Sequence, residues 1–324
     1  MGKATILVLC VAMLALLPAV VLATQSRGFE LSLETVPFDG LGDGEGAQRP
    51  DLQFKLFLPT EYQTDTNVRL PVIYLLHGSN GSFKTSEWDD FFPVLSELIS
   101  SGKIPPMIAV APVAGNSYWV DSDKYGSYET AIMKALIPYI DAHYRTQDER
   151  GNRFVAGFSM GGYGALRYAL VYPEIFEACI LLSPFVQSEE PPATSRAATG
   201  GVFANADGNF DRAIWDKKNY PAMLKAYAQQ ENRVRFFIYT SDDDWNHLSE
   251  KEDLPIDAWK YNMEIQAVKL YSALKREDPF NADFPQWEDV PGNPAELRIV
   301  DGGHDSSVWL RGFADGLEYI FSGM

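Results

Sequence analysis

The stretch "FVAGFSMGGYGA", from Phe154 to Ala165, places a single serine, Ser159, among four glycines directly after an apolar run. It contains the pattern G-x-S-x-G, which is typical of a turn that holds a reactive serine above a sheet but also occurs in ordinary loops. The context separates the two interpretations. A reactive serine of this kind follows a strand and opens a helix.

The flanking residues meet that condition. Phe154–Gly157 is a short apolar run after the turn-forming sequence "DERGNR", and "GGYGALRYALVY" has the apolar spacing of a helix. Gly157 and Gly161 permit a tight, strained turn, because a Cβ atom at either position would collide with neighbouring backbone. Gly162 and Gly164 are expected to let the helix approach the sheet closely. The sequence therefore predicts a strand, a sharp turn at Ser159 and a helix.

The whole chain predicts an α/β fold with a mostly parallel central sheet flanked by helices, because short apolar runs alternate with amphipathic segments. "FELSLETV" and "LQFKLFL", joined by a Gly/Asp-rich turn, predict an antiparallel start. No linker interrupts residues 24–324, so we predict a single domain there. The predicted strands are Leu52–Leu58, Val72–Leu76, Met107–Ala111, Phe154–Gly157, Ala178–Leu182, Val234–Tyr239 and Leu297–Val300.

The segment "ETAIMKALIPYIDAHYR" predicts an amphipathic helix. We expect Pro138 to kink this helix without ending it. His143 falls on the apolar face and is expected to be a satisfied core histidine. The residues that define this face are Ile132, Ala135, Leu136, Tyr139, Ile140 and His143.

Two segments look inserted into this pattern. Val186–Gly208 is rich in Ser, Ala, Gly and Pro, and Asp278–Glu296 contains Pro and aromatic residues without a period. Long loops in a compact domain are often binding or lid segments, although surface decoration is an equally good interpretation.

The first 23 residues predict a cleaved signal peptide. Lys3 precedes an apolar run from Ala4 to Ala23, which ends in small residues suited to a signal peptidase. A retained N-terminal anchor is the alternative, because the run is nearly long enough to span a bilayer. We expect cleavage, no stable membrane span afterwards, and a secreted or periplasmic protein.

Composition limits the partners. The 324-residue chain has a net charge of −17 and no run of Lys and Arg, so nucleic acids and anionic membrane surfaces are poor partners. Cys179 is the one cysteine beyond the leader, so no internal disulfide is expected. It lies in an apolar run and is expected to be a small buried side chain.

A serine hydroxyl is a weak nucleophile until a base removes its proton, and the chain offers four histidines. His143 is assigned to the core, and His77 in "HGSNGS" lies where such a fold supplies oxyanion donors. His247 lies in an acidic loop. His304, in "VDGGHDSSVW", follows the last predicted strand and completes the chain order serine, acid, histidine. We therefore predict His304 as the base.

The acid that orients this base is expected on the loop after strand 234–239, in "TSDDDW". Asp242, Asp243 and Asp244 all qualify, and the sequence does not say which points inward. A calcium loop that starts at Asp242 is the alternative, but His247 and Asp253 stand where such a loop needs Gly and Glu. No metal site is predicted.

Negative charge that develops on a carbonyl oxygen during attack must meet preorganised N–H donors. One is expected at Met160, the residue after the nucleophile, and another in the loop "HGSNGS".

Several stretches together resemble the putative-esterase family of α/β-hydrolases, which includes feruloyl and acetylxylan esterases, esterase D-type thioesterases and mycolyltransferases. They are "YLLHGSNGS", "NSYWVDSDKYGSYETAIMKALIPYIDAHYRT", "RFVAGFSMGGYGALRYALVYPEIFEACILLSPF" and "DGGHDSSVW". The resemblance implies an α/β-hydrolase fold, Ser159 as nucleophile, His304 as base, and the N–H groups of Ser79 and Met160 as the oxyanion hole. It favours Asp244 as the acid, because Ser241-x-x-Asp244 aligns with the family's G-x-x-D turn.

The resulting hypothesis is a secreted serine carboxylesterase that needs no cofactor and acts on small-molecule or carbohydrate-linked esters. Stacking on substrate rings is considered for four aromatic residues. An acyltransferase with the same triad and a non-catalytic binding module of the same fold are the alternatives. The four aromatic residues are Trp88, Tyr118, Trp119 and Trp309.

Overall fold

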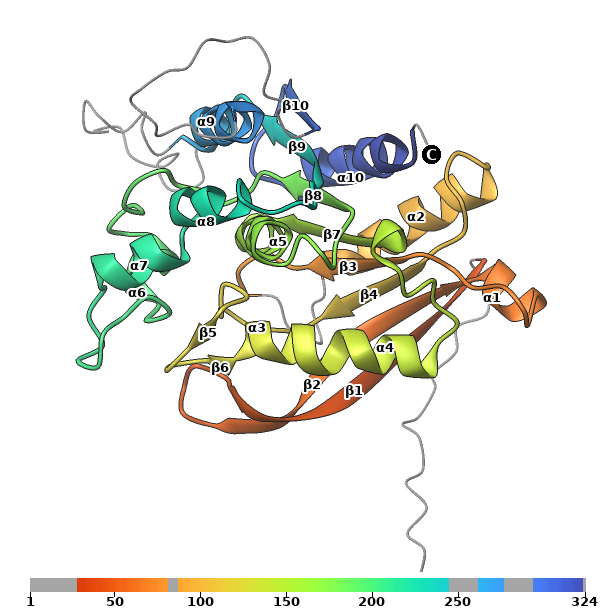
Figure 1. Ribbon diagram of the computed structural model, residues 1–324, viewed down its shortest axis with the longest axis horizontal. Coiled ribbons are helices and arrows are strands. Elements are labelled where there is room, and N and C mark those ends of the chain that lie inside the picture. Colours follow the sequence, from red (N-terminus) through yellow and green to blue (C-terminus); the bar gives the residue numbers. More distant parts are fainter. Residues whose placement is uncertain (1–27, 81–86, 245–261, 277–293, 323–324) are drawn as a thin grey trace, which may run out of the picture.

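The computed structural model describes residues 28–80, 87–244, 262–276 and 294–322. Its centre is a ten-stranded sheet with the strand order β10-β9-β8-β7-β3-β4-β2-β1-β6-β5 (Figure 1). The run from β10 to β4 is parallel, whereas β2, β1, β6 and β5 continue the sheet through antiparallel pairs. The predicted mostly parallel sheet and its antiparallel start are therefore confirmed.

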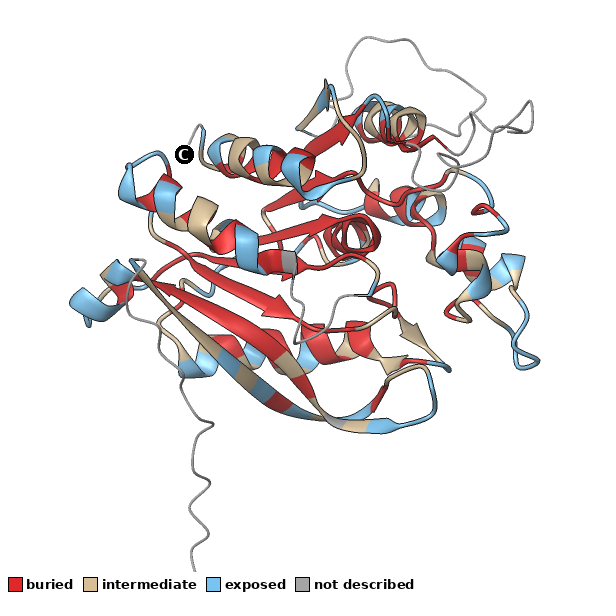
Figure 2. Ribbon diagram, turned by 180° about the vertical axis from the view of Figure 1, so that it is seen from behind, coloured by how far each residue is buried: buried red, intermediate tan, exposed pale blue. Residues whose placement is uncertain are grey.

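Most strands form where the sequence predicts them, but the two-residue strands Asp121–Ser122 and Gly126–Ser127 were not predicted. The bounds of the strands are β1 Phe29–Gly42, β2 Gln48–Pro59, β3 Val72–Leu76, β4 Ile108–Pro112, β5 Asp121–Ser122, β6 Gly126–Ser127, β7 Arg153–Phe158, β8 Ala178–Leu182, β9 Arg235–Ser241 and β10 Ala295–Val300. Strands β3, β4, β7 and β8 are buried at every residue, because helices cover both faces of this part of the sheet (Figure 2).

Helices lie on both faces of the sheet. Alternate residues along each strand point to opposite faces, so the core divides into two clusters. One cluster packs against α2 (Phe91–Ser100) and α10 (Ser306–Phe321). The other packs against α3 (Tyr128–Ala131), η2 (Ile132–Leu136), α4 (Ile137–His143), α5 (Met160–Val171), α8 (Tyr220–Tyr227) and α9 (Met263–Arg276). The remaining short helices are α1 Thr60–Thr64, η1 Glu87–Asp90, η3 Arg150–Asn152, α6 Arg196–Thr199 and α7 Arg212–Lys218.

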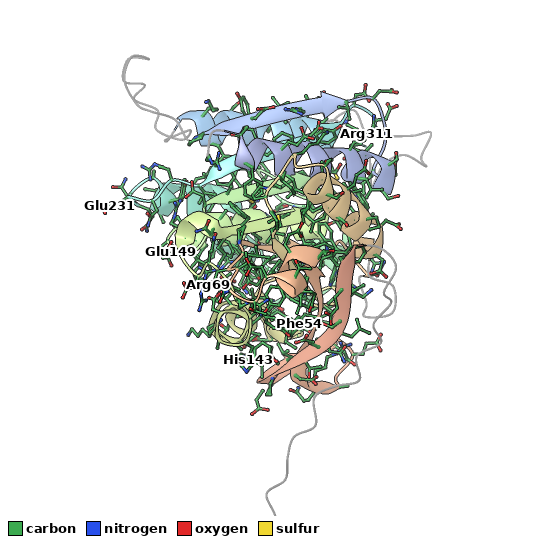
Figure 3. All side chains as sticks on the ribbon, turned by 90° about the vertical axis from the view of Figure 1, so that its right-hand side faces the viewer. Phe54, Arg69, His143, Glu149, Glu231 and Arg311 are labelled. Carbon is green, nitrogen blue, oxygen red and sulfur yellow. The ribbon has the colours of Figure 1, made fainter. Side chains whose placement is uncertain are left out.

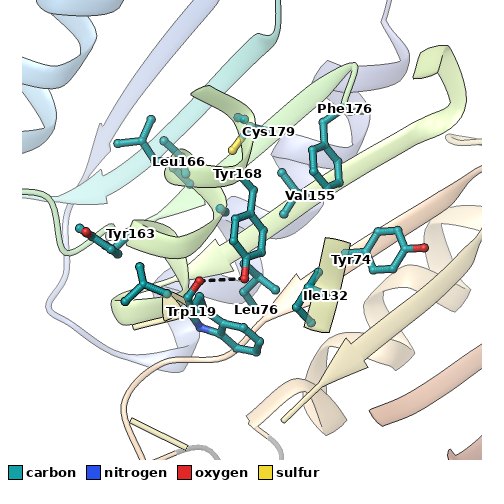
Figure 4. Close-up of a cluster of buried hydrophobic side chains, with 14 of the residues drawn as sticks. Tyr74, Leu76, Trp119, Ile132, Val155, Tyr163, Leu166, Tyr168, Phe176 and Cys179 are labelled. Carbon is teal, nitrogen blue, oxygen red and sulfur yellow. Dashed lines mark hydrogen bonds between the residues drawn. The ribbon is translucent and has the colours of Figure 1, made fainter. Parts of the chain in front are cut away.

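The centre of the second cluster lies between α5 and the sheet (Figure 4). The Tyr168 hydroxyl on α5 donates to the Trp119 carbonyl oxygen over 2.9 Å, which ties the helix to the loop after β4. Cys179 is fully buried there, as predicted, and burial raises the pKa of its thiol.

The prediction for His143 is wrong. Its side chain is exposed at the end of α4 (Figure 3). It stacks on the Tyr139 ring, with 4.0 Å between ring centroids. The helix contains one π turn, Ile132–Leu136, directly before the segment with Pro138. Beyond this turn the predicted face still meets the core, because Ile140 is 0% exposed and Tyr139 packs against the core. His143 is exposed because it is the last residue of α4, beyond the part of the helix that the core covers. The segment stays helical past Pro138, as predicted.

The inserted segment 186–208 packs on the core rather than decorating the surface. Phe203 contacts the rings of Tyr118 and Trp215, at 5.5 and 4.9 Å between ring centroids. The predicted signal peptide, residues 245–260 and residues 278–293 of the other inserted segment lie outside the described residues. No helix within the described ranges is both long and apolar enough to cross a membrane.

Candidate active site

Ser159 lies at the turn between β7 and α5, with φ 53° and ψ −120°. A positive φ is strained for a residue with a Cβ atom and costs about 1–3 kcal/mol. Backbone hydrogen bonds hold the turn. The Ser159 N–H donates to the Leu182 carbonyl over 3.0 Å, and the Ser159 carbonyl accepts from the N–H groups of Tyr163 and Phe185. These hydrogen bonds offset the strain and keep the hydroxyl at the tip of the turn.

The glycines beside Ser159 make this turn sterically possible. A Cβ atom on Gly157 would overlap the Gly161 carbonyl, and one on Gly161 would overlap the Leu76 carbonyl. Gly162 allows close contacts with Pro184 after β8 and with the Gly157 carbonyl of β7, whereas Gly164 lies against Trp119 in the loop after β4 and not against a strand.

His304 lies beside Ser159, on the loop between β10 and α10. Its Nε2 is 3.0 Å from the Ser159 Oγ, and its Nδ1 is 2.9 Å from an Asp244 carboxylate oxygen. The next residue, Asp305, caps α10 by accepting from the N–H groups of Ser307 and Val308. The Ser307 hydroxyl also donates to Asp305 and lowers the pKa of its carboxyl group. The cap fixes the chain directly after His304.

The structure separates the three candidate aspartates. Asp244 is 0% exposed, and its second carboxylate oxygen lies 3.4 Å from the Thr240 hydroxyl. Asp242 and Asp243 are exposed, and Asp242 accepts instead from the Gly302 N–H over 3.2 Å. Sequence alone leaves this choice open, whereas the fold turns only Asp244 toward His304.

A calcium loop from Asp242 fits this arrangement poorly, because Asp244 is buried against His304 and Thr240. Three exposed carboxylates, on Asp242, Asp243 and Asp301, do lie close together. Exposed acidic groups commonly gather without an ion, and we assign no site to them. His247 and Asp253 lie outside the described residues.

The residues expected to form the oxyanion hole come from two elements. Met160 is the first residue of α5, where backbone N–H groups have no carbonyl partner within the helix. Ser79 lies on the loop after β3. Both line the same cavity as Ser159 and His304, which has a volume of about 380 Å³.

His77 holds the loop after β3 through hydrogen bonds of its ring. It is buried, its Nε2 accepts from the Ala114 N–H over 3.0 Å, and its Nδ1 lies 2.6 Å from the Gly78 carbonyl. These two contacts fit one neutral tautomer, with the proton on Nδ1. Burial lowers the pKa of His77 to about 4. With both ring nitrogens engaged, His77 is a structural residue and not a second base.

Aromatic side chains form much of the cavity wall. Trp309 stacks on Phe158, with 4.6 Å between ring centroids, and Tyr118 meets the Phe185 ring edge-on. Tyr118 has a φ of 53°, so this wall also has a strained backbone. Of the four aromatics considered from sequence, Tyr118 and Trp309 line the cavity, whereas Trp88 and Trp119 are buried in the core.

One charged residue of the cavity was missed in the sequence. Arg196 lies in the inserted segment and lines the cavity with Ser159. The only local signal is that it is the sole cation of 186–208, within "PPATSRAATG". Nothing in the local pattern connects this arginine with a serine that lies 37 positions earlier.

The chain matches the model of the Putative esterase family over residues 48–320, which is most of its length. An esterase of Mycobacterium tuberculosis is 37% identical over 122 residues, which are 36% of this chain and 25% of that protein. The match thus spans about a quarter of that relative's length. An acetyl esterase of Caldicellulosiruptor saccharolyticus is 23% identical over 280 residues, 84% of this chain and 88% of that protein.

Solved structures share the fold over nearly the whole chain. A ferulic acid esterase has a TM-score of 0.65 and 22% identity, and the match covers 92% of this chain and 99% of that one. A fluorophosphonate-binding serine hydrolase of Staphylococcus aureus has a TM-score of 0.63 and 16% identity, with 90% and 98% covered. The predicted α/β-hydrolase fold is confirmed by this likeness.

Proposed function

We propose that this chain, which belongs to the Putative esterase family, is a serine carboxylesterase that acts through an acyl-enzyme. The observation that carries the proposal is the hydrogen-bonded series Ser159, His304 and Asp244, with contacts of 3.0 and 2.9 Å. Nucleophile, base and orienting carboxylate at such distances are the arrangement that activates a serine hydroxyl.

In the first half of the reaction, the Ser159 Oγ attacks the ester carbonyl carbon while the His304 Nε2 takes the hydroxyl proton. The carbonyl oxygen becomes negatively charged and is stabilised by the N–H groups of Ser79 and Met160. The bond to the alcohol oxygen then breaks, and the His304 Nε2 returns its proton to that oxygen. The alcohol leaves, and the acyl group stays on Ser159.

In the second half, water replaces the alcohol. His304 removes a proton from the water as it attacks the acyl carbon, and the proton returns to the Ser159 Oγ as the acid leaves. Asp244 accepts from the Nδ1–H throughout, which fixes the tautomer and stabilises the imidazolium. The chemistry needs no cofactor.

We expect the cavity to accept esters that carry a small or flat group, because flat aromatic rings form its wall. These rings belong to Tyr118, Phe158, Phe185 and Trp309. The likeness to a ferulic acid esterase makes phenolic and carbohydrate-linked esters the first substrates to test. The proposed location is outside the cytoplasm, on the strength of the apolar leader in residues 1–23. An N-terminus of the exported protein near residue 24 would support it, and an intact leader would contradict it.

The test is an ester panel assayed with wild-type protein and its Ser159→Ala variant. It includes 4-nitrophenyl acetate and pentanoate, methyl ferulate and acetylated xylan. We expect turnover of at least one ester by the wild-type protein and a loss of about 10³-fold or more in the variant. Folded wild-type protein that turns over none of them contradicts the proposal. Ester product formed only when an acceptor alcohol is added would instead identify an acyltransferase.

A further inference from the structure

Arg196 is held at the cavity wall by the packing of its neighbours. It is the first residue of the short helix α6, between Ser195 and Ala197, which are 0% and 1% exposed. The Ser195 hydroxyl caps the helix by accepting from the Ala198 N–H. Because both neighbours face the core, the Arg196 side chain is directed outward, and it lines the cavity that contains Ser159.

The rest of the inserted segment anchors this position. The Tyr125 hydroxyl donates to the Gly200 carbonyl at the end of α6, over 3.5 Å. Phe203 is buried between the rings of Tyr118 and Trp215. Arg196 is therefore carried by a packed element and not by a free loop.

Within the described part of the chain, the Arg196 guanidinium has no carboxylate partner. Several other arginines there do form ion pairs, among them Arg150, Arg153, Arg167, Arg212 and Arg298. The described residues that line the cavity include no Asp or Glu, so none of these residues neutralises the cation. Burial raises the pKa of the Tyr118 hydroxyl and the Arg196 charge opposes that rise, which places the cation in electrostatic reach of the aromatic wall.

The positive charge of Arg196 is opposite in sign to the net charge of the whole molecule. At a net charge of −17 the protein repels anions at long range. A guanidinium in the cavity that has no carboxylate partner among the described residues makes the local potential positive, over the Debye length of about 8 Å that holds at physiological salt. Guanidinium groups bind carboxylates and similar oxyanions through paired N–H donors.

We propose that Arg196 is a specificity-determining residue that binds a negatively charged group on the ester substrate. The preferred substrate is then an ester in which the acyl or the alcohol part carries a carboxylate. This inference rests on the proposed esterase function and adds the charge class of the substrate to it.

The test compares isosteric charged and neutral esters. For the acyl part, the pair is mono-4-nitrophenyl succinate and 4-nitrophenyl pentanoate. For the alcohol part, it is 4-acetoxybenzoate and 4-methylphenyl acetate. The measured quantity is the ratio of kcat/KM for the anionic ester to that for the neutral ester, in wild-type protein, Arg196→Gln, Arg196→Lys and Lys217→Gln. Lys217→Gln is the matched control, because it removes the same charge at an exposed position on α7.

For at least one pair, we expect Arg196→Gln to lower this ratio by about 10- to 100-fold, the range of a hydrogen bond to a charged group. Arg196→Lys should keep an intermediate ratio, and Lys217→Gln should stay within about twofold of wild type, because a surface charge acts weakly at a distance. The two esters of a pair differ in intrinsic reactivity, but this difference is the same for every variant. It therefore cancels when the kcat/KM ratios of the variants are compared.

An unchanged ratio in Arg196→Gln for both pairs overturns the inference. An equal fall for the charged and the neutral ester also overturns it, because Arg196 would then maintain only the shape of the cavity. Either result leaves the esterase intact, since the neutral ester reports that activity separately. Wild-type protein without Ser159-dependent turnover of any ester contradicts the proposed function itself.

Discussion

At the scale of single residues, the site depends on side chains that neighbour each other in sequence but differ in environment. Asp242, Asp243 and Asp244 follow the same strand, yet only Asp244 is buried and faces His304. The sequence predicts that one of the three is the acid. It cannot select one from local pattern, because the direction of each side chain is set by the register of β9 against β10 and by contacts such as Gly302 N–H to Asp242.

We expect Asp244→Asn to lower kcat/KM by about 10³- to 10⁴-fold, because an amide favours the wrong tautomer of His304. Asp242→Asn should stay within about threefold of wild type, since this carboxylate is exposed and accepts from the Gly302 N–H instead of from His304. Both changes remove one charge, so the second is the control for the first. The measurement is the steady-state kcat/KM of each variant on the best ester of the panel. Equal losses of kcat/KM in the two variants would contradict the assignment of Asp244 as the acid.

His77 makes stability depend on pH. Its pKa is about 4 in the folded protein, below the value of about 6.5 for an unperturbed histidine. The unfolded state therefore binds more protons between these values. The stabilisation is fully present above pH ~6.5 and is lost as pH falls toward 4, by up to about 3 kcal/mol.

Urea unfolding at several pH values between 7.5 and 4.5 measures this effect. We expect the free energy of unfolding to depend less steeply on pH in His77→Gln than in wild-type protein. His143→Gln, which changes an exposed histidine, is the control and should keep the wild-type slope. A His77→Gln slope equal to that of wild type would show that His77 is not the neutral buried group described above.

At the scale of elements, the strand–turn–helix around Ser159 is the part of the site most fully contained in the sequence. Apolar runs and glycines predict its order and its bounds to within a residue or two. The buried face of the helix at residues 128–143 was predicted to continue to His143, but the core covers it only as far as Ile140. Local pattern thus determines the turn at Ser159, whereas the point at which a helix leaves the core depends on the packing around it.

Gly161→Ala tests the steric basis of the turn. A Cβ atom would overlap the Leu76 carbonyl, which belongs to the adjoining strand and cannot move freely. We expect a loss of about 3 kcal/mol in the free energy of unfolding, at the upper end of overpacking effects. Gly151→Ala is the control, because nothing lies within 4 Å of its Cβ position, and it should change stability by less than about 0.5 kcal/mol. Thermal unfolding compares the two, and equal stabilities would contradict the steric account.

At the scale of the whole molecule, the cavity is built where the carboxyl ends of the parallel strands meet. Ser159 follows β7, Ser79 follows β3, Asp244 follows β9 and His304 follows β10. This is the edge at which open α/β sheets place their ligands. The alternation of strands and helices predicts that edge from the sequence.

The sequence does not predict that the inserted segment 186–208 reaches the cavity. The segment 186–208 contributes Arg196 because Phe203 and other apolar side chains fold it against Tyr118 and Trp215. These contacts join residues that are far apart in the chain, and no periodicity marks them. The charge of the cavity is therefore a property of the tertiary structure.

The central claim is that Ser159 carries the acyl group during turnover. The most direct measurement is to mix the protein rapidly with an excess of its best 4-nitrophenyl ester, quench in acid and map the peptides by mass spectrometry. The account predicts the mass of the acyl group on the peptide that contains Ser159, and no adduct in Ser159→Ala. A wild-type protein that hydrolyses the ester but carries the acyl group on another residue, with the Ser159→Ala variant equally active, would contradict it.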